Sequence, residues 1–109
     1  MANPTKASWT DPSTNTDGSA IASGEITGYQ IGVRLTTGTA GTYAYTASAP
    51  ATATSELLSL LTPVLPTGVQ LVGAVMALST TNGNSAWSTE SAAFTMLAPP
   101  SPPTGFQIA

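Results

Sequence analysis

The sequence predicts an all-β protein, an antiparallel sandwich of short strands. Segments rich in β-branched and aromatic residues recur at spacings of roughly 8–12 residues, with Gly, Pro and Asn clusters between them. The longest segment, Val69–Leu78, has no proline and reads as a central strand. It is too short for a membrane-spanning helix, which needs about 20 apolar residues, so we expect no membrane insertion.

The central strand is expected to begin a hairpin. Thr80–Ser85 contains an Asn-Gly pair that suits a tight reversal, and Ala86–Met96 is expected to return as the partner strand. Ile26–Leu35 alternates, so Tyr29, Ile31 and Val33 should share one face. Tyr29 and Ile31, together with Trp9, Leu71 and Val75, are the expected core.

Shorter patterns predict three further strands, Thr5–Thr10, Thr42–Thr46 and Ser55–Leu61. The last could be helix or strand by pattern alone, but its short length between two prolines favours strand. Residues 47–54 are expected to be loop.

Composition excludes several classes of function. The 109 residues suffice for one domain with one core, and only 6% of them are charged, with a net charge of -3. Lys6 and Arg34 are the only cations, too few for a nucleic-acid surface. Cys and His are absent, which removes disulfides, thiolate metal sites and the commonest general base. We therefore expect no catalytic residue, no cofactor and no metal. A surface with so few charges needs another route to solubility, or it is largely covered by neighbours in an assembly.

Over roughly residues 5–97 the chain resembles a fibronectin type III domain. The resemblance rests on the order and spacing of five motifs: Ala7-Ser-Trp9 with Asp11-Pro12; Ile26, Tyr29 and Ile31; Leu57, Leu60 and Pro66-Thr-Gly68; Leu71, Gly73, Val75 and Ala77; Gly83-Asn-Ser85 with Trp87-Ser88. It implies an immunoglobulin-like sandwich. The corner tyrosine of that family is replaced by Leu71.

The ends depart from the family pattern, because too few residues precede Trp9 for a first strand. Pro99–Ala109 instead resembles the family's proline-rich lead and first strand. We therefore divide the chain into a sandwich, residues 1–97, and an arm, residues 98–109. To reach the first-strand position of its own sandwich, the arm would have to span a strand length, on the order of 30 Å. Ala98–Pro103 reaches only about 19 Å as polyproline. We therefore expect the arm to enter a neighbouring subunit; the alternative is a frayed tail.

Three patterns in the sequence could form small-molecule sites. Ser13-x-Asn15-x-Asp17-Gly18 faintly resembles a calcium loop, but it lacks the leading Asp and the final Glu, so an ordinary Asx turn is favoured. The five carboxylates could supply a glycosidase pair, yet the chain has few aromatics to line a sugar cleft: Asp11, Asp17, Glu25, Glu56 and Glu90. Trp87, Tyr43 and Tyr45 could stack on a surface glycan, although Trp87 is favoured as a flank of the core.

The alternation of the central strand predicts an apolar outer face. If Leu71 faces the core, then Val72, Ala74, Met76 and Leu78 face outward, where apolar patches mark interfaces. The alternative is that residues 38–50 fold over them. The residues expected to carry interactions are Val72, Met76, Leu78, Trp87, Phe106 and Ile108.

These observations favour a non-enzymatic structural module. The first hypothesis is a small virion protein of a tailed bacteriophage (capsid decoration, head fibre or tail), whose partners are other copies of itself or other virion proteins. Such a protein needs neither Cys nor a secretory signal, and the first residues carry no apolar run of that kind. The alternative is a spacer or carbohydrate-binding module of a secreted bacterial glycosidase or adhesin.

Overall fold

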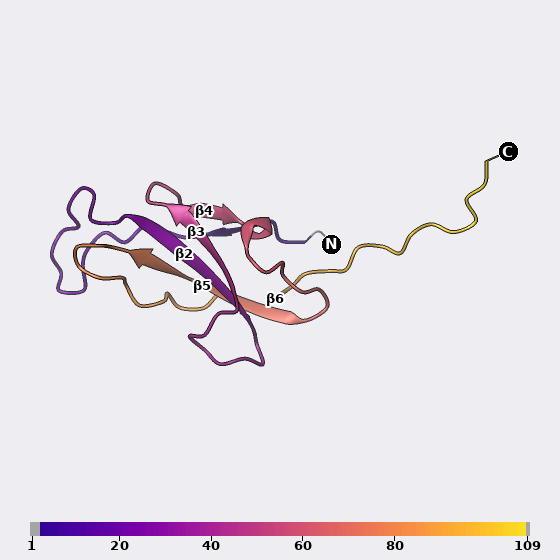
Figure 1. Ribbon diagram of the computed structural model, residues 1–109. Helices are drawn as coiled ribbons and strands as arrows, with labels where there is room; N and C mark the ends of the chain where they lie inside the picture. The colour runs from indigo at the N-terminus through magenta and orange to yellow at the C-terminus, as the bar shows by residue number, and fades with distance from the viewer. Residues whose placement is uncertain (1–2, 109) are drawn as a thin grey trace.

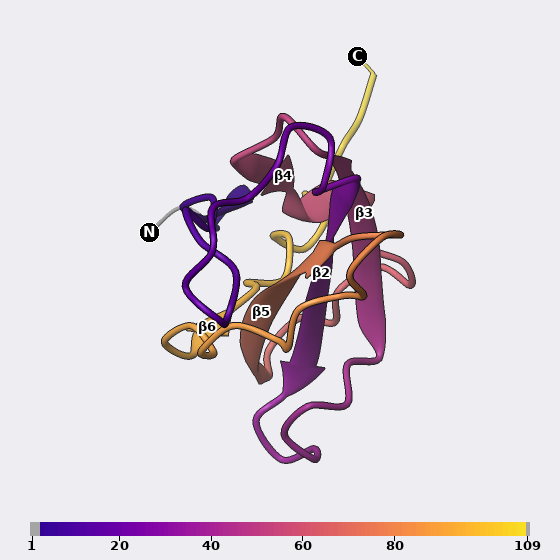
Figure 2. The ribbon, with the colours of Figure 1, turned by 90° about the vertical axis from the view of Figure 1, so that its left-hand side faces the viewer.

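The computed structural model describes residues 3–108, so residues 1, 2 and 109 of the predicted sandwich and arm lie outside it. Two antiparallel sheets form two layers (Figures 1 and 2). One sheet pairs β1 (Lys6–Ser8) with β4 (Ser55–Leu57); the other has the order β3 (Tyr45–Pro50), β2 (Gly28–Leu35), β5 (Gln70–Leu78), β6 (Phe94–Thr95). This confirms the prediction of an all-β antiparallel sandwich.

The pairing of β2 with β5 forms the centre of the larger sheet. Its register runs without a break from Gly28 opposite Leu78 to Leu35 opposite Leu71. Both strands lack proline, so neither loses a ladder hydrogen bond. The other strands of the sheet then add to the two outer edges of this pair.

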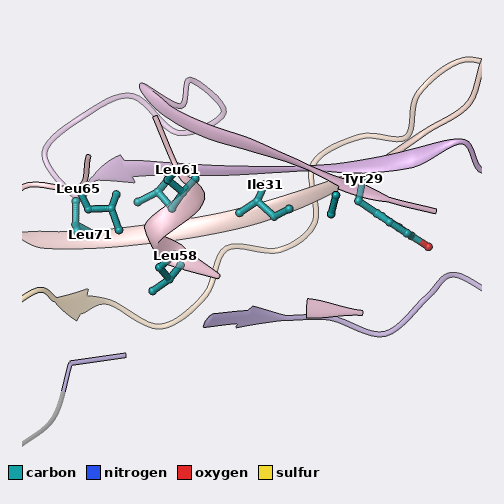
Figure 3. Close-up of a cluster of buried hydrophobic side chains, with 8 residues drawn as sticks. Tyr29, Ile31, Leu58, Leu61, Leu65 and Leu71 are labelled. Carbon is teal, nitrogen blue, oxygen red and sulfur yellow. The ribbon is translucent and has the colours of Figure 1, made fainter. Parts of the chain in front are cut away.

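The core lies between the two layers, as the alternation of β2 predicted. Tyr29, Ile31 and Val33 are 2%, 3% and 1% exposed, and Leu71 of β5 is 0% exposed. Leucines from the segment after β4 meet them, as Figure 3 shows for Leu58, Leu61 and Leu65. Trp9 and Val75 are half-buried and pack against this cluster, with the Trp9 and Tyr29 ring centroids 5.3 Å apart.

Two of the predicted strands are placed differently in the structure. The strand expected over 42–46 lies at Tyr45–Pro50 instead, because pairing with β2 buries Ala49 opposite Tyr29 despite the weak strand propensity of alanine. The strand expected over 55–61 ends at Leu57, and a 3₁₀ turn follows at Leu58–Leu60. This turn lets Leu58 and Leu61 both point inward, whereas a strand would send residues three apart to opposite faces.

The strand predicted over 86–96 is wrong for most of its length, and only Phe94–Thr95 is strand. Three serines take its place beside β5. The N–H groups of Ser85, Ser88 and Ser91 donate to alternate carbonyls of β5, those of Ala77, Val75 and Gly73, at 2.8–2.9 Å. Each serine Oγ accepts the N–H of the same β5 residue at 2.9–3.1 Å. We call this arrangement the serine ladder.

The serine ladder advances three residues for every two of β5, whereas strands in a β-ladder advance one for one. Side chains three apart therefore share a face of the segment. Trp87 and Glu90 lie over the outer face of the sheet, against Tyr43 and Arg34. Thr89 and Ala92 lie on another side, where they line a groove described below.

The core makes a direct prediction. Leu71→Ala should destabilise the protein by about 2–5 kcal/mol, because it removes a fully buried side chain and leaves a cavity. Denaturant unfolding measures this loss. Val64→Ala is the control, since Val64 is 85% exposed and its truncation should change little. Equal stability of the two variants would contradict the packing described here.

The serine ladder makes a second prediction. Ser88→Ala should cost about 0.5–1.5 kcal/mol, because the N–H of Val75 loses its acceptor. Thr89→Ala is the matched control, since the adjacent Thr89 side chain is exposed and only its carbonyl is engaged. Urea unfolding of both variants checks this. A loss no larger than that of the control would show that the hydroxyls do not secure this edge.

Candidate functional site

A groove of about 650 Å³ runs beside β1, between that strand and the serine ladder. Its floor is apolar and includes Ile31, Val33 and Val75, and Thr89 and Ala92 stand opposite β1. Trp9 and Phe94 also line it and are only half-buried. The core therefore remains partly uncovered on this side.

The C-terminal arm, residues 98–108, makes up the other half of the candidate site. It has no assigned strand or turn, every residue is exposed, and it leads away from the sandwich (Figure 1). Phe106 and Ile108 are 84% and 88% exposed. Two large apolar side chains so fully in water are a liability for a lone subunit and are typical of an interaction segment.

Leu97, the residue that precedes the arm, is hydrogen-bonded to Asn3 next to the start of β1. The Leu97 N–H donates to Asn3 Oδ1 at 2.7 Å, and Asn3 Nδ2 donates to the Leu97 carbonyl at 3.3 Å. Asn3 thus pairs with Leu97 much as a neighbouring strand would. We call this end of the sandwich the arm pole, and the opposite end, with residues 11–27 and 79–85, the loop pole, which faces the viewer in Figure 2.

The outer face of β5 is not an exposed apolar patch, contrary to our expectation. Val72 and Ala74 are buried, and Met76 and Leu78 are half-buried. The ring of Tyr43 packs on Gly32, where an added Cβ would lie only 2.6 Å from it, and Gly32 is paired with Ala74. Tyr43 lies within residues 38–50, so its position agrees with the alternative that this segment folds over the outer face of β5.

Trp87 belongs to this cover and stacks on Tyr43, with ring centroids 4.5 Å apart. Beside them, Arg34 lies opposite Val72 and donates to both oxygens of Glu90 at 2.7 Å. The Tyr43 hydroxyl donates to the same carboxylate at 2.8 Å. These hydrogen bonds stabilise the charged carboxylate and so hold the pKa of Glu90 below its usual value. The bonds from Arg34 have the largest effect. Sequence reasoning missed this cluster, although Arg34 and Glu90 are two of only seven charged residues.

Three further carboxylates, those of Asp11, Asp17 and Glu25, accept hydrogen bonds from nearby groups. Asp17 Oδ1 accepts the N–H and the hydroxyl of Ser19, the Asx-turn geometry favoured for this loop, and these bonds lower its pKa. Asp11 accepts the Tyr29 hydroxyl at 2.7 Å, and Glu25 accepts the Ala22 N–H at 3.1 Å. Burial, aided by Asp11, raises the pKa of Tyr29 to about 12. Within residues 3–108 no three metal-ligating side chains come together.

A second hollow, of about 470 Å³, lies at the loop pole. Polar loop residues line it, among them Asn15, Asp17, Glu25 and Asn82. Several of these already bond one another or nearby backbone groups. The groove beside β1 differs from this hollow in being lined mainly by apolar side chains.

Comparison with protein-family models, with curated protein sequences and with solved structures gives no match for this chain. No helix among residues 3–108 has the length and apolar character needed to cross a membrane.

The Glu90 cluster predicts an acid-sensitive stability. A carboxyl whose pKa is lower in the folded state stabilises above its unfolded value, near 4.5, and that stabilisation is lost as the pH falls through the folded value. The free energy of unfolding should therefore drop on acidification below about pH 4.5, and less steeply in Glu90→Gln. Glu56→Gln, which removes a carboxylate with no hydrogen bond in the described chain, controls for net charge. Identical slopes for Glu90→Gln and the parent would refute the prediction.

Proposed function

We propose that this chain is a non-enzymatic structural module, a small virion protein of a tailed bacteriophage (capsid decoration, head fibre or tail). It assembles through contacts of the β-sandwich and through its C-terminal arm. Its sandwich is proposed to be of the fibronectin type III kind, with the first strand displaced to the arm. Its partners are other copies of itself or other virion proteins, and its location is the virion.

One observation carries this proposal. The sandwich has an open apolar groove beside β1, and the same chain has an exposed apolar arm that does not fill it. Filling such a groove removes apolar surface from water, which stabilises the contact by roughly 25 cal/mol for each Å² of apolar surface buried. Phe106 and Ile108 supply large side chains for that purpose. A groove and an arm in one chain are the two halves of an assembly contact.

The surface chemistry supports a structural role. Only 6% of residues are charged, and four of the five carboxylates accept hydrogen bonds that brace loops or side chains. A neutral, hydroxyl-rich surface suits a subunit surrounded by its neighbours.

The alternative, a spacer or carbohydrate-binding module of a secreted glycosidase or adhesin, has one observation in its favour. Trp87 is half-buried on the outer face of the sheet, and aromatic rings bind sugars by stacking. Its ring already stacks on Tyr43, however, at 4.5 Å. This contact leaves less of the Trp87 ring free to stack on a sugar and favours a structural role for this side chain.

The assembly proposal predicts an oligomer that depends on the arm. In light scattering, the parent should exceed the monomer mass of 10.9 kDa increasingly with concentration. The double variant Phe106→Ser/Ile108→Ser should remain a monomer, because its arm has lost the side chains that fill the groove. Gln107→Ser changes the residue between them and should assemble like the parent.

A parent that stays monomeric at all concentrations overturns self-assembly and favours the spacer alternative. A monomeric Gln107→Ser variant would show that the apolar side chains are not what drives association. The virion location is tested separately, by mass spectrometry of purified particles, which should contain the chain in fixed ratio to the capsid protein.

A further inference from the structure

The edge of β1 that faces the groove has free backbone groups. Trp9 donates its N–H to Thr54, and Leu58 donates its N–H to Thr5, both at 2.9 Å. Hydrogen bonding alternates along an antiparallel strand, so Thr5, Ala7 and Trp9 bond to β4. The N–H and C=O groups of Lys6 and Ser8 then point to the other edge. Within residues 3–108, β1 pairs with β4 alone.

The groove lies directly under this free edge. Residues 6–10 line one side of it, and Ile31, Val33 and Leu58 reach it from the core. A strand laid along β1 would therefore find hydrogen-bond partners on its edge and apolar contacts on its inner face. These are the two requirements of β-strand addition, in which the main chain gives affinity and alternate side chains give specificity.

The arm matches both requirements. Phe106 and Ile108 alternate with Gln107, so an extended arm presents both apolar side chains on one face and the amide on the other. The segment Thr104–Ile108 also has no proline, and every residue can donate to a ladder. The four prolines of the arm are confined to residues 99–103.

The arm cannot easily serve its own groove. Asn3 holds Leu97 at the arm pole, and the proline-rich segment 99–103 then leads away from the sandwich. Such a segment is a semi-rigid rod that extends about 3.1 Å per residue. Phe106 is thereby placed far from the groove of its own subunit and within reach of another.

We propose that Thr104–Ile108 of one copy adds as an antiparallel strand to the free edge of β1 in a second copy, an inference that rests on the assembly function proposed above. Phe106 and Ile108 fill the groove, and Gln107 faces solvent. The apolar arm residues share the inward face with Ala7 and Trp9, which pack toward the core.

The prolines exclude the register shifted toward the start of β1. With Gln107 opposite Ser8, Phe106 lies opposite Trp9 and Ile108 opposite Ala7, and Pro103 falls beyond the end of β1. A shift by two residues would put Gln107 opposite Lys6 and Pro103 opposite Thr10, where the ladder needs an N–H that proline lacks. The first register also pairs two aromatic side chains across the strands, a favourable contact.

The relative orientation of two joined copies follows from the positions of the arm pole and the loop pole. An antiparallel strand enters the groove at its Trp9 end, nearest the loop pole, while every arm leaves from the arm pole. The arm pole of one copy therefore meets the loop pole of the next. Because this contact joins two different surfaces, repeating it gives an open head-to-tail chain unless the rotation closes a ring.

Cysteine cross-linking tests the strand pairing, and the chain has no cysteine of its own. Chains carrying Ser8→Cys are mixed with chains carrying Gln107→Cys and oxidised. Directly opposed residues in this pairing have Cα atoms about 5.5 Å apart, within the disulfide range, so a covalent dimer should form. Ser55→Cys is the matched control: it is equally exposed and lies opposite Ser8 on β4, away from the groove. It should not cross-link to Gln107→Cys.

The double variant Ser8→Cys/Gln107→Cys tests the head-to-tail order. Non-reducing gels should show a ladder of covalent multimers. A fast-migrating monomer would mean that the arm folds back on itself, which overturns addition to a second copy. A closed dimer alone would mean reciprocal exchange, which overturns the head-to-tail order. Lys6→Cys in place of Ser8→Cys should cross-link less, and a stronger band for Lys6→Cys would overturn the register.

The outcome separates this inference from the proposed function. Oligomers that depend on Phe106 and Ile108 without a Ser8–Gln107 cross-link would leave assembly through the arm intact and refute addition to β1. Circular dichroism of Ser8→Cys confirms that the variant is folded, as expected for an exposed position. With no oligomers and no cross-link, both proposals fail.

Discussion

The pairing of β2 with β5 is the constraint on which the rest of the structure depends. Its unbroken register sends Tyr29, Ile31, Val33 and Leu71 to one side, where they form the core. The same register places Gly32 beside Ala74 on the other side, which leaves room for the ring of Tyr43. Both layers of contact around the sheet are thus set by one strand pair.

The features that could be read from the sequence are those fixed by strand periodicity. The inward face of β2 followed directly from its alternation, because a pleated strand has only two faces. The alternation of Phe106 and Ile108 with Gln107 is a local pattern of the same kind, but both side chains are exposed in this subunit, so their burial in a neighbour stays a prediction.

The features that could not be read are fixed by contacts between distant segments. Val72 is buried opposite Arg34, and Arg34 is held in turn by Glu90, 56 positions away. Ala74 lies opposite Gly32, on which the ring of Tyr43 packs. The serine ladder could not be predicted from the sequence for a different reason. Ser85, Ser88 and Ser91 recur every third residue, a period that belongs to neither a flat strand nor an α-helix, and serine is common throughout this chain.

The serine ladder has a consequence for aggregation. An ordinary edge strand repeats its pattern of donors and acceptors on its far side and can template further strands without limit. The segment 85–91 coils too tightly for that, and its serine hydroxyls turn back to the carbonyls of Ala86, Thr89 and Ala92. This flank of the larger sheet therefore offers no regular edge to which a further strand could add, which blocks amyloid-like stacking along it.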